Sequence, residues 1–177
     1  MGDARDLGVL AVRLGVGGLC IAHGAQKLFG WFGGGGVKGT GQFFDSMGFT
    51  PGDRNATMAG LAEAGGGLFL AAGLATGPAG AALLGNMVVA SSVHAPAVFA
   101  TSGGYELPAT YALLGSAFVL TGPGRYSLDY ATGYAVNKPW MRVVAVVGAA
   151  ASAAYLIRKR SKVLADRDEA SESDAGT

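Results

Sequence analysis

The chain has 177 residues, half of them hydrophobic and only 14% charged, and its mean hydropathy is +0.37. This composition is too apolar for an ordinary soluble domain. A net charge of +1 gives no reason to expect nucleic-acid binding. The single cysteine, Cys20, excludes an internal disulfide and a cysteine cluster for zinc or iron–sulfur. We therefore predict an all-α integral membrane bundle without a metal site.

Five apolar stretches have about the length of a membrane-spanning helix, which is roughly 20 residues. They cover residues 7–29, 57–75, 79–99, 105–121 and 140–157. The first four predict a four-helix core, and the last predicts a fifth transmembrane helix.

Glycine and proline residues mark the expected breaks between these helices. Gly77 and Pro78 separate the second stretch from the third and predict a tight helical hairpin.

Three alanines at a spacing of four residues, Ala145, Ala149 and Ala153, form a small-residue ladder in the fifth stretch. Such a ladder is suited to close docking within the chain or against a copy.

The first long connection, residues 30–56, is rich in glycine before it becomes amphipathic. Phe43, Phe44, Met47 and Phe49 alternate there with polar residues. This pattern predicts a short helix over about 37–50 that lies at the membrane interface. A plain surface loop is the alternative.

The chain becomes strongly charged after Ile157. Residues 158–177 begin with Arg-Lys-Arg-Ser-Lys and then turn acidic. Because this composition cannot bury a core, we expect a disordered tail. Its basic start is a stop-transfer signal and favours a cytoplasmic C-terminus. Lys38 and Arg54 in the first connection agree with that orientation, whereas Arg125 and Lys138 do not.

The expected organisation has three parts. Residues 1–130 form a four-helix membrane domain that includes the interfacial segment 30–56. Residues 131–157 form a linker and the fifth helix, and residues 158–177 form the tail.

Polar side chains within apolar stretches are costly in hydrocarbon and therefore mark candidate sites or buried polar contacts. Because successive helices alternate in direction, helices 1 and 3 should end on the side of the membrane where helices 2 and 4 begin. This places one layer of polar residues on that side: His23, Gln26, Lys27, Glu63, His94 and Glu106.

A second, smaller polar set should lie on the opposite side of the membrane. Arg13 is about six residues inside the first stretch, and Arg125 and Asp129 follow the fourth. We expect Asp129 or the acidic residues of the N-terminus to be the partner of Arg13.

The main layer has three interpretations. Lys27 with Glu63 or Glu106 could be a structural ion pair that fixes helix register. Alternatively, the layer could bind a quinone head group or relay protons. Haem ligation by His23 and His94 is a third, less favoured reading. Cys20 is expected to be a packing residue.

The order and spacing of several short motifs in this sequence resemble those of the DoxX family of small bacterial membrane proteins. The resemblance covers roughly residues 7–130. The matching pieces are Arg13-Leu14, His23-Gly24, Lys27-Leu28-Phe29, Gly35-Gly36, Phe43 to Gly48, Glu63, Gly65-Gly66, Asn86-Met87, His94, Gly103-Gly104-Tyr105-Glu106 and the run from Gly122 to Asp129.

The resemblance implies a four-helix bundle in the bacterial inner membrane with a connection to redox chemistry. Relatives include the small-subunit type of a thiosulfate:quinone oxidoreductase. Actinobacterial members resemble a subunit that associates with a superoxide dismutase and a sulfurtransferase in oxidative-stress defence. The implied role is a subunit of a quinone-linked or thiol-stress complex that acts with a partner oxidoreductase. The sequence has no cofactor motif of its own.

Two other function classes stay open. A non-catalytic membrane anchor or assembly factor, alone or as a homo-oligomer, needs only the bundle and a docking surface. A small-molecule transporter is less favoured, because the chain shows no inverted repeat of the kind that many secondary transporters have.

Overall fold

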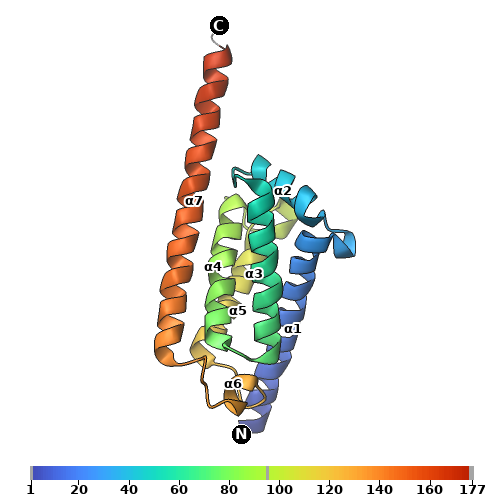
Figure 1. Ribbon diagram of the computed structural model, residues 1–177, viewed down its shortest axis with the longest axis vertical. Helices are drawn as coiled ribbons and strands as arrows, with labels where there is room; N and C mark the ends of the chain where they lie inside the picture. Colours follow the sequence, from blue (N-terminus) through green and yellow to red (C-terminus); the bar gives the residue numbers. More distant parts are fainter. Residues whose placement is uncertain (1, 95, 176–177) are drawn as a thin grey trace.

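The computed structural model describes residues 2–94 and 96–175, and within these ranges the chain is helical and contains no strand. Helices α1, α3, α4 and α5 form a bundle, and α7 stands beside α4 (Figure 1). The elements are α1 (Gly2–Phe29), η1 (Trp31–Gly33), α2 (Gly36–Ser46), α3 (Gly52–Ala72), α4 (Thr76–His94), η2 (Ala100–Ser102), α5 (Glu106–Thr121), α6 (Leu128–Ala131) and α7 (Pro139–Ala175). The prediction of an all-α bundle with a fifth long helix is confirmed.

The outer surface of the bundle is apolar. Leu14 on α1 is 53% exposed, Leu113 on α5 is 72% exposed and Val144 on α7 is 61% exposed. Side chains of this kind suit hydrocarbon rather than water. The helical segments Asp3–Phe29 and Pro139–Asp174 are long and apolar enough to cross a membrane. The chain is therefore an integral membrane protein.

Glycine allows the helices of the bundle to pack backbone to backbone. A Cβ atom on Gly17 of α1 would lie 2.6 Å from the carbonyl oxygen of Gly67 on α3. A Cβ on Gly80 of α4 would lie 2.7 Å from the carbonyl oxygen of Gly115 on α5. Close packing of small residues is a main source of helix association in lipid, where no hydrophobic force drives helices together.

The turn between α3 and α4 lies earlier than the sequence suggested. It occupies residues 73–75, where Gly73 has φ 67° and Ala75 has φ 47°. Gly77 and Pro78, the expected turn residues, instead belong to the first turn of α4. Proline is tolerated there because the first helical N–H groups have no intrahelical partner.

The connection after α1 contains the expected short helix. It appears as α2, Gly36–Ser46, and packs against α3. The plain-loop alternative is therefore wrong, while the position of α2 at the membrane interface stays a prediction.

The expected disorder after Ile157 is not found in residues 158–175, since α7 continues as one helix to Ala175. Residues 176–177 lie outside the described ranges. The physical reason is that a helix already formed in the membrane is extended without a new nucleation step. Basic side chains of the extension also bind the end of α2: Arg160 Nε donates to the Met47 carbonyl at 2.9 Å, and Arg167 Nη2 to the Asp45 carbonyl at 2.9 Å. Composition alone does not reveal such contacts.

The alanine ladder of α7 docks within the chain. A Cβ atom on Gly85 of α4 would lie 2.9 Å from the Cβ of Ala149, and Ala153 is only 4% exposed. Small residues therefore hold the membrane part of α7 against α4.

Candidate functional site: a buried ion pair between three helices

The centre of the candidate site is the carboxylate of Glu63 on α3. Lys27 Nζ of α1 lies 2.6 Å from Glu63 Oε2. Glu63 Oε1 accepts a hydrogen bond of 3.0 Å from Asn86 Nδ2 of α4. The side chains of Lys27 and Glu63 are 21% and 9% exposed. One carboxylate thus joins three helices of the bundle.

Close approach of α1 and α3 makes this ion pair possible. A Cβ atom on Gly24 would lie 2.5 Å from the backbone nitrogen of Ala64, and one on Gly60 would lie 3.3 Å from Lys27 Cβ. Since neither glycine carries a side chain, the two backbones meet one turn away from the charged residues. Lys27 also lies in the last turn of α1, where a cation interacts favourably with the helix dipole.

A small cavity of about 10 Å³ adjoins Glu63. Glu63, Asn86 and Cys20 supply its polar lining. A space of this size holds about one water molecule. Cys20 is 4% exposed and packs in the core with Val16 and Leu70, as expected for a packing residue.

His23 and Gln26 turn toward the surface near the end of α1. His23 is exposed, and its Nδ1 lies 3.0 Å from Gln26 Oε1. Gln26 Nε2 in turn donates to the carbonyl of Phe32 at 3.3 Å. These contacts tie the end of α1 to η1, and neither residue lines the cavity beside Glu63.

His94 and Glu106 belong to the junction of α4 and α5. The sequence predicted that α4 would reach Phe99 and hold His94 inside the membrane, but the helix ends at His94. His94 is exposed, and its Nδ1 lies 2.8 Å from the carbonyl oxygen of Gly103. The half-buried Glu106 begins α5, and its side chain makes no hydrogen bond to any described residue.

The structure thus brings Lys27 and Glu63 together and adds Asn86, which was not among the expected site residues. A polar amide within an apolar helix was the available signal for Asn86. The signal was weak, because an isolated asparagine can equally face another helix or the lipid.

The opposite end of the bundle contains a buried polar network around the turn from α3 to α4. Arg13 is fully buried; its Nη1 donates to the carbonyl of Leu70 at 3.3 Å, and its Nη2 donates to the carbonyl of Tyr126. Arg13 therefore satisfies carbonyl groups at the C-terminus of α3, where a cation is favourable.

Asp129, also fully buried, binds the other side of the same turn. Its Oδ1 accepts from the backbone of Ala75 at 2.8 Å, and its Oδ2 accepts from the backbone of Thr76 at 2.9 Å. Asn137 Nδ2 donates to Oδ2 at 2.7 Å. The carboxylate thus caps the N-terminus of α4.

The expected pairing of Arg13 with Asp129 or an N-terminal acid is not found among the described residues. Arg13 and Asp129 hold opposite sides of one turn, but they make no direct ion pair in the described part of the chain. The N-terminal acid Asp6 instead contacts Arg125, with 3.8 Å between Asp6 Oδ2 and Arg125 Nε.

A surface ion pair links α2 to α3 at the end of the bundle where α1 ends. Lys38 Nζ donates to Asp53 Oδ2. This hydrogen bond, together with the charge of the Asp53 carboxylate, raises the pKa of Lys38. Both side chains are well exposed, so the pair positions α2 only weakly.

Fold and site together define a class: an all-α integral membrane bundle with an ion pair buried among three of its helices. Residues 8–95, about half of the chain, match the model of the DoxX family. They include most of α1, all of α2, α3 and α4, and the whole Lys27–Glu63–Asn86 site. The chain belongs to the DoxX family. A search of curated proteins and a search of solved structures gave no match.

Proposed function

We propose that this chain is the membrane subunit of a redox complex and that the Lys27–Glu63–Asn86 site handles protons for it. The observation that supports this role is the 2.6 Å ion pair of Lys27 and Glu63 inside the family-matched region. Ionisable residues within a membrane are costly, and they commonly mark proton or substrate paths.

The chemistry of the pair suits proton exchange. Lys27 and Glu63 have no net charge together, and a proton passing from the ammonium to the carboxylate would leave two neutral groups. Asn86 holds the second carboxylate oxygen and fixes its direction. Electron carriers would come from a partner, for which the candidates are an oxidoreductase, a superoxide dismutase or a sulfurtransferase.

The size of the cavity limits how a quinone could use this site. About 10 Å³ beside Glu63 does not accommodate a quinone ring. A quinone would therefore have to meet the site from the bilayer, at the 21% exposed side chain of Lys27. For haem, His23 and His94 offer no support, since each is exposed and bonded within its own segment.

The test is quinone-dependent electron transfer in membranes that contain the native partner. Glu63→Gln keeps the shape of the side chain and the contact with Asn86 but removes its acidity. We expect this variant to reach the membrane and bind the partner while transfer falls by at least about tenfold. His23→Ala is the control and should retain transfer. Full transfer by Glu63→Gln would contradict the proposed role.

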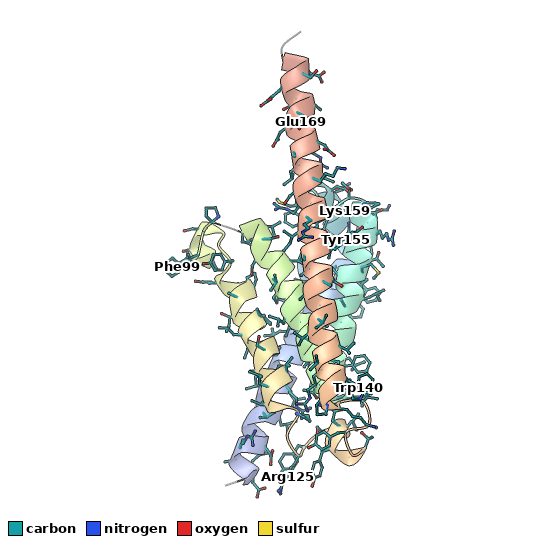
Figure 2. The ribbon with its side chains drawn as sticks, turned by 90° about the vertical axis from the view of Figure 1, so that its left-hand side faces the viewer. Phe99, Arg125, Trp140, Tyr155, Lys159 and Glu169 are labelled. Atoms are coloured by element: carbon teal, nitrogen blue, oxygen red, sulfur yellow. The ribbon has the colours of Figure 1, made fainter. Side chains whose placement is uncertain are left out.

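A second candidate function, a non-catalytic anchor or assembly factor, is favoured by the shape of α7. Residues 158–175 extend about 27 Å along the helix axis, and the part around Glu169 projects beyond the bundle (Figure 2). An exposed helix of this kind offers a docking arm for a soluble partner.

Affinity purification from native membranes separates the two candidates. If the chain is an anchor only, a chain that stops after Arg167 loses its partner, whereas Glu63→Gln has no effect on electron transfer. If the chain is a redox subunit, Glu63→Gln keeps the partner and loses transfer.

We also propose that the projecting end of α7 lies in the cytoplasm of a bacterial cell. Lys38 lies on α2 and Arg54 at the start of α3, and Lys159 of the basic segment 158–162 donates to the carbonyl of Thr50 between these two helices. Excess Lys and Arg is typical of cytoplasmic loops. A cysteine-accessibility experiment with a single cysteine placed at Ser171, in a Cys20→Ala background, tests the orientation: labelling in intact cells would contradict it.

A further inference from the structure

A polar groove of about 360 Å³ lies at the end of the bundle opposite the buried ion pair. It is bordered by the start of α1, the end of α5 and the segment that leads into α7. Its charged and aromatic lining consists of Arg5, Asp6, Arg125, Arg142, Tyr130 and Tyr134. We propose that this groove binds a phosphate ester, supplied by the headgroup of an anionic phospholipid.

The charge of the groove favours an anion. It contains three arginines and a single acidic residue, Asp6. Asp6 is already engaged, because its Oδ1 accepts from the backbone of Arg125 at 3.2 Å and its Oδ2 lies 3.8 Å from Arg125 Nε. Arg5 makes no ion pair with any described residue. Guanidinium groups are well matched to phosphate oxygens in geometry and charge.

One of these arginines is held in place before any ligand binds. Arg142 Nε donates to Asn137 Oδ1 at 2.9 Å, and its Nη1 donates to the carbonyl of Val119 at 3.3 Å. Its Nη2 has no hydrogen-bond acceptor among the described residues. A Cβ atom on Gly122 would lie 3.4 Å from Nη2, so this glycine leaves the donor open toward the groove.

The surroundings of the groove favour a lipid over a soluble ester. Leu7 and Leu120, next to groove residues in sequence, are 52% and 81% exposed and can contact acyl chains. Tyr130 and Tyr134 pack edge to face with centroids 6.3 Å apart, and Trp140 lies at the same end as Arg125 (Figure 2). Aromatic residues gather at the level of lipid headgroups, and guanidinium groups at that level can pair with headgroup phosphate oxygens.

The experiment uses the full chain, purified in an uncharged detergent, and follows its melting temperature. The additives, at constant ionic strength, are phosphatidylglycerol, phosphatidylcholine and soluble glycerol 3-phosphate. We expect phosphatidylglycerol to stabilise the protein most. For Arg5→Gln/Arg125→Gln, its half-saturating concentration should rise about 25-fold, since each basic residue near an anionic lipid contributes about fivefold.

Two further variants make the test independent of the fold of the double variant. Lys138→Gln removes an exposed charge near the same end that does not line the groove, and it should respond like the wild type. Asp6→Asn keeps an oxygen acceptor for the Arg125 backbone but removes the only acid of the lining. It should lower the half-saturating concentration of phosphatidylglycerol about fivefold.

Equal stabilisation by phosphatidylcholine and phosphatidylglycerol would overturn the proposal, as would unchanged responses in the Asp6→Asn and the double-arginine variants. Equal protection by glycerol 3-phosphate, lost in the double variant, would support the phosphate site and overturn its assignment to lipid.

Discussion

Glu63 binds a lysine from one neighbouring helix and an asparagine from another, so its carboxylate is fully paired in the interior of the bundle. Paired charges of this kind add little net stability, but loss of one partner leaves a charge in a medium that solvates it poorly. Asp129 at the opposite end is a similar case: its hydrogen bonds add little net stability, but loss of one of them should be costly.

The first prediction at this scale concerns the ion pair. Lys27→Met should destabilise the protein by about 3 kcal/mol, because the carboxyl group of Glu63 loses its charged partner in the interior of the bundle. In the double variant Lys27→Met/Glu63→Gln, much of this loss should be recovered. Reversible unfolding in mixed micelles measures the two values.

Lys38→Met is the matched control, since it breaks the exposed pair with Asp53. It should cost about 0.5 kcal/mol or less. If Lys27→Met lowered the free energy of unfolding no more than Lys38→Met, the buried ion pair would not contribute to stability.

The second prediction concerns Asp129. In Asp129→Asn one acceptor oxygen becomes an amide donor that faces the backbone N–H groups of the α4 start or the Asn137 amide. We expect a loss of about 3 kcal/mol in unfolding free energy. Asp166→Asn, on the exposed face of α7, should change stability by less than about 0.5 kcal/mol.

At the scale of the helices, contact between backbones is what sets the geometry of the site. The crossing of α1 and α3 depends on Gly17, Gly24, Gly60 and Gly67, and it is this crossing that brings Lys27 to Glu63. Gly17 contacts the backbone of α3, whereas the adjacent Gly18 has open space around it. Substitution of each by alanine therefore tests the importance of this contact.

Gly17→Ala should destabilise the bundle by about 1–3 kcal/mol, because its Cβ would meet the backbone of α3 and force the helices apart. Gly18→Ala has open space around its Cβ and should be neutral, or stabilising by about 0.5–1 kcal/mol, through helix propensity. Thermal unfolding in detergent compares the two. Equal effects would show that the close approach of α1 and α3 contributes nothing.

At the scale of the whole molecule, α7 connects two parts of the protein. Its first half packs on α4. In its second half, Arg160 and Arg167 bind the end of α2, and Lys159 donates to the carbonyl of Thr50 in the connection from α2 to α3. Arg160 also lies 5.8 Å from the centroid of the Phe49 ring. The extension therefore holds α2 against the bundle as well as projecting beyond it (Figure 1).

A truncation series tests this coupling. A chain that stops after Ile157 loses all three basic contacts, and hydrogen exchange in residues 43–50 should rise about tenfold. A chain that stops after Arg167 keeps them and should exchange like the full chain. Equal protection in both truncated chains would show that α2 is held by α3 alone.

The sequence by itself determined the all-α membrane class, the places of the long helices and the family, because apolar stretches and their breaks are local properties of the chain. It also identified Lys27 and Glu63 as candidates, since charges within apolar stretches are conspicuous. Only the tertiary structure decided which polar residues meet, because contact depends on the rotation of each helix and on where it ends. Thus Asn86 reaches Glu63, while His23 and His94 stay at the surface. The helical course of residues 158–175 was not predicted either, because this segment continues a helix formed in the membrane and its first part is held by contacts with α2 that local composition does not encode.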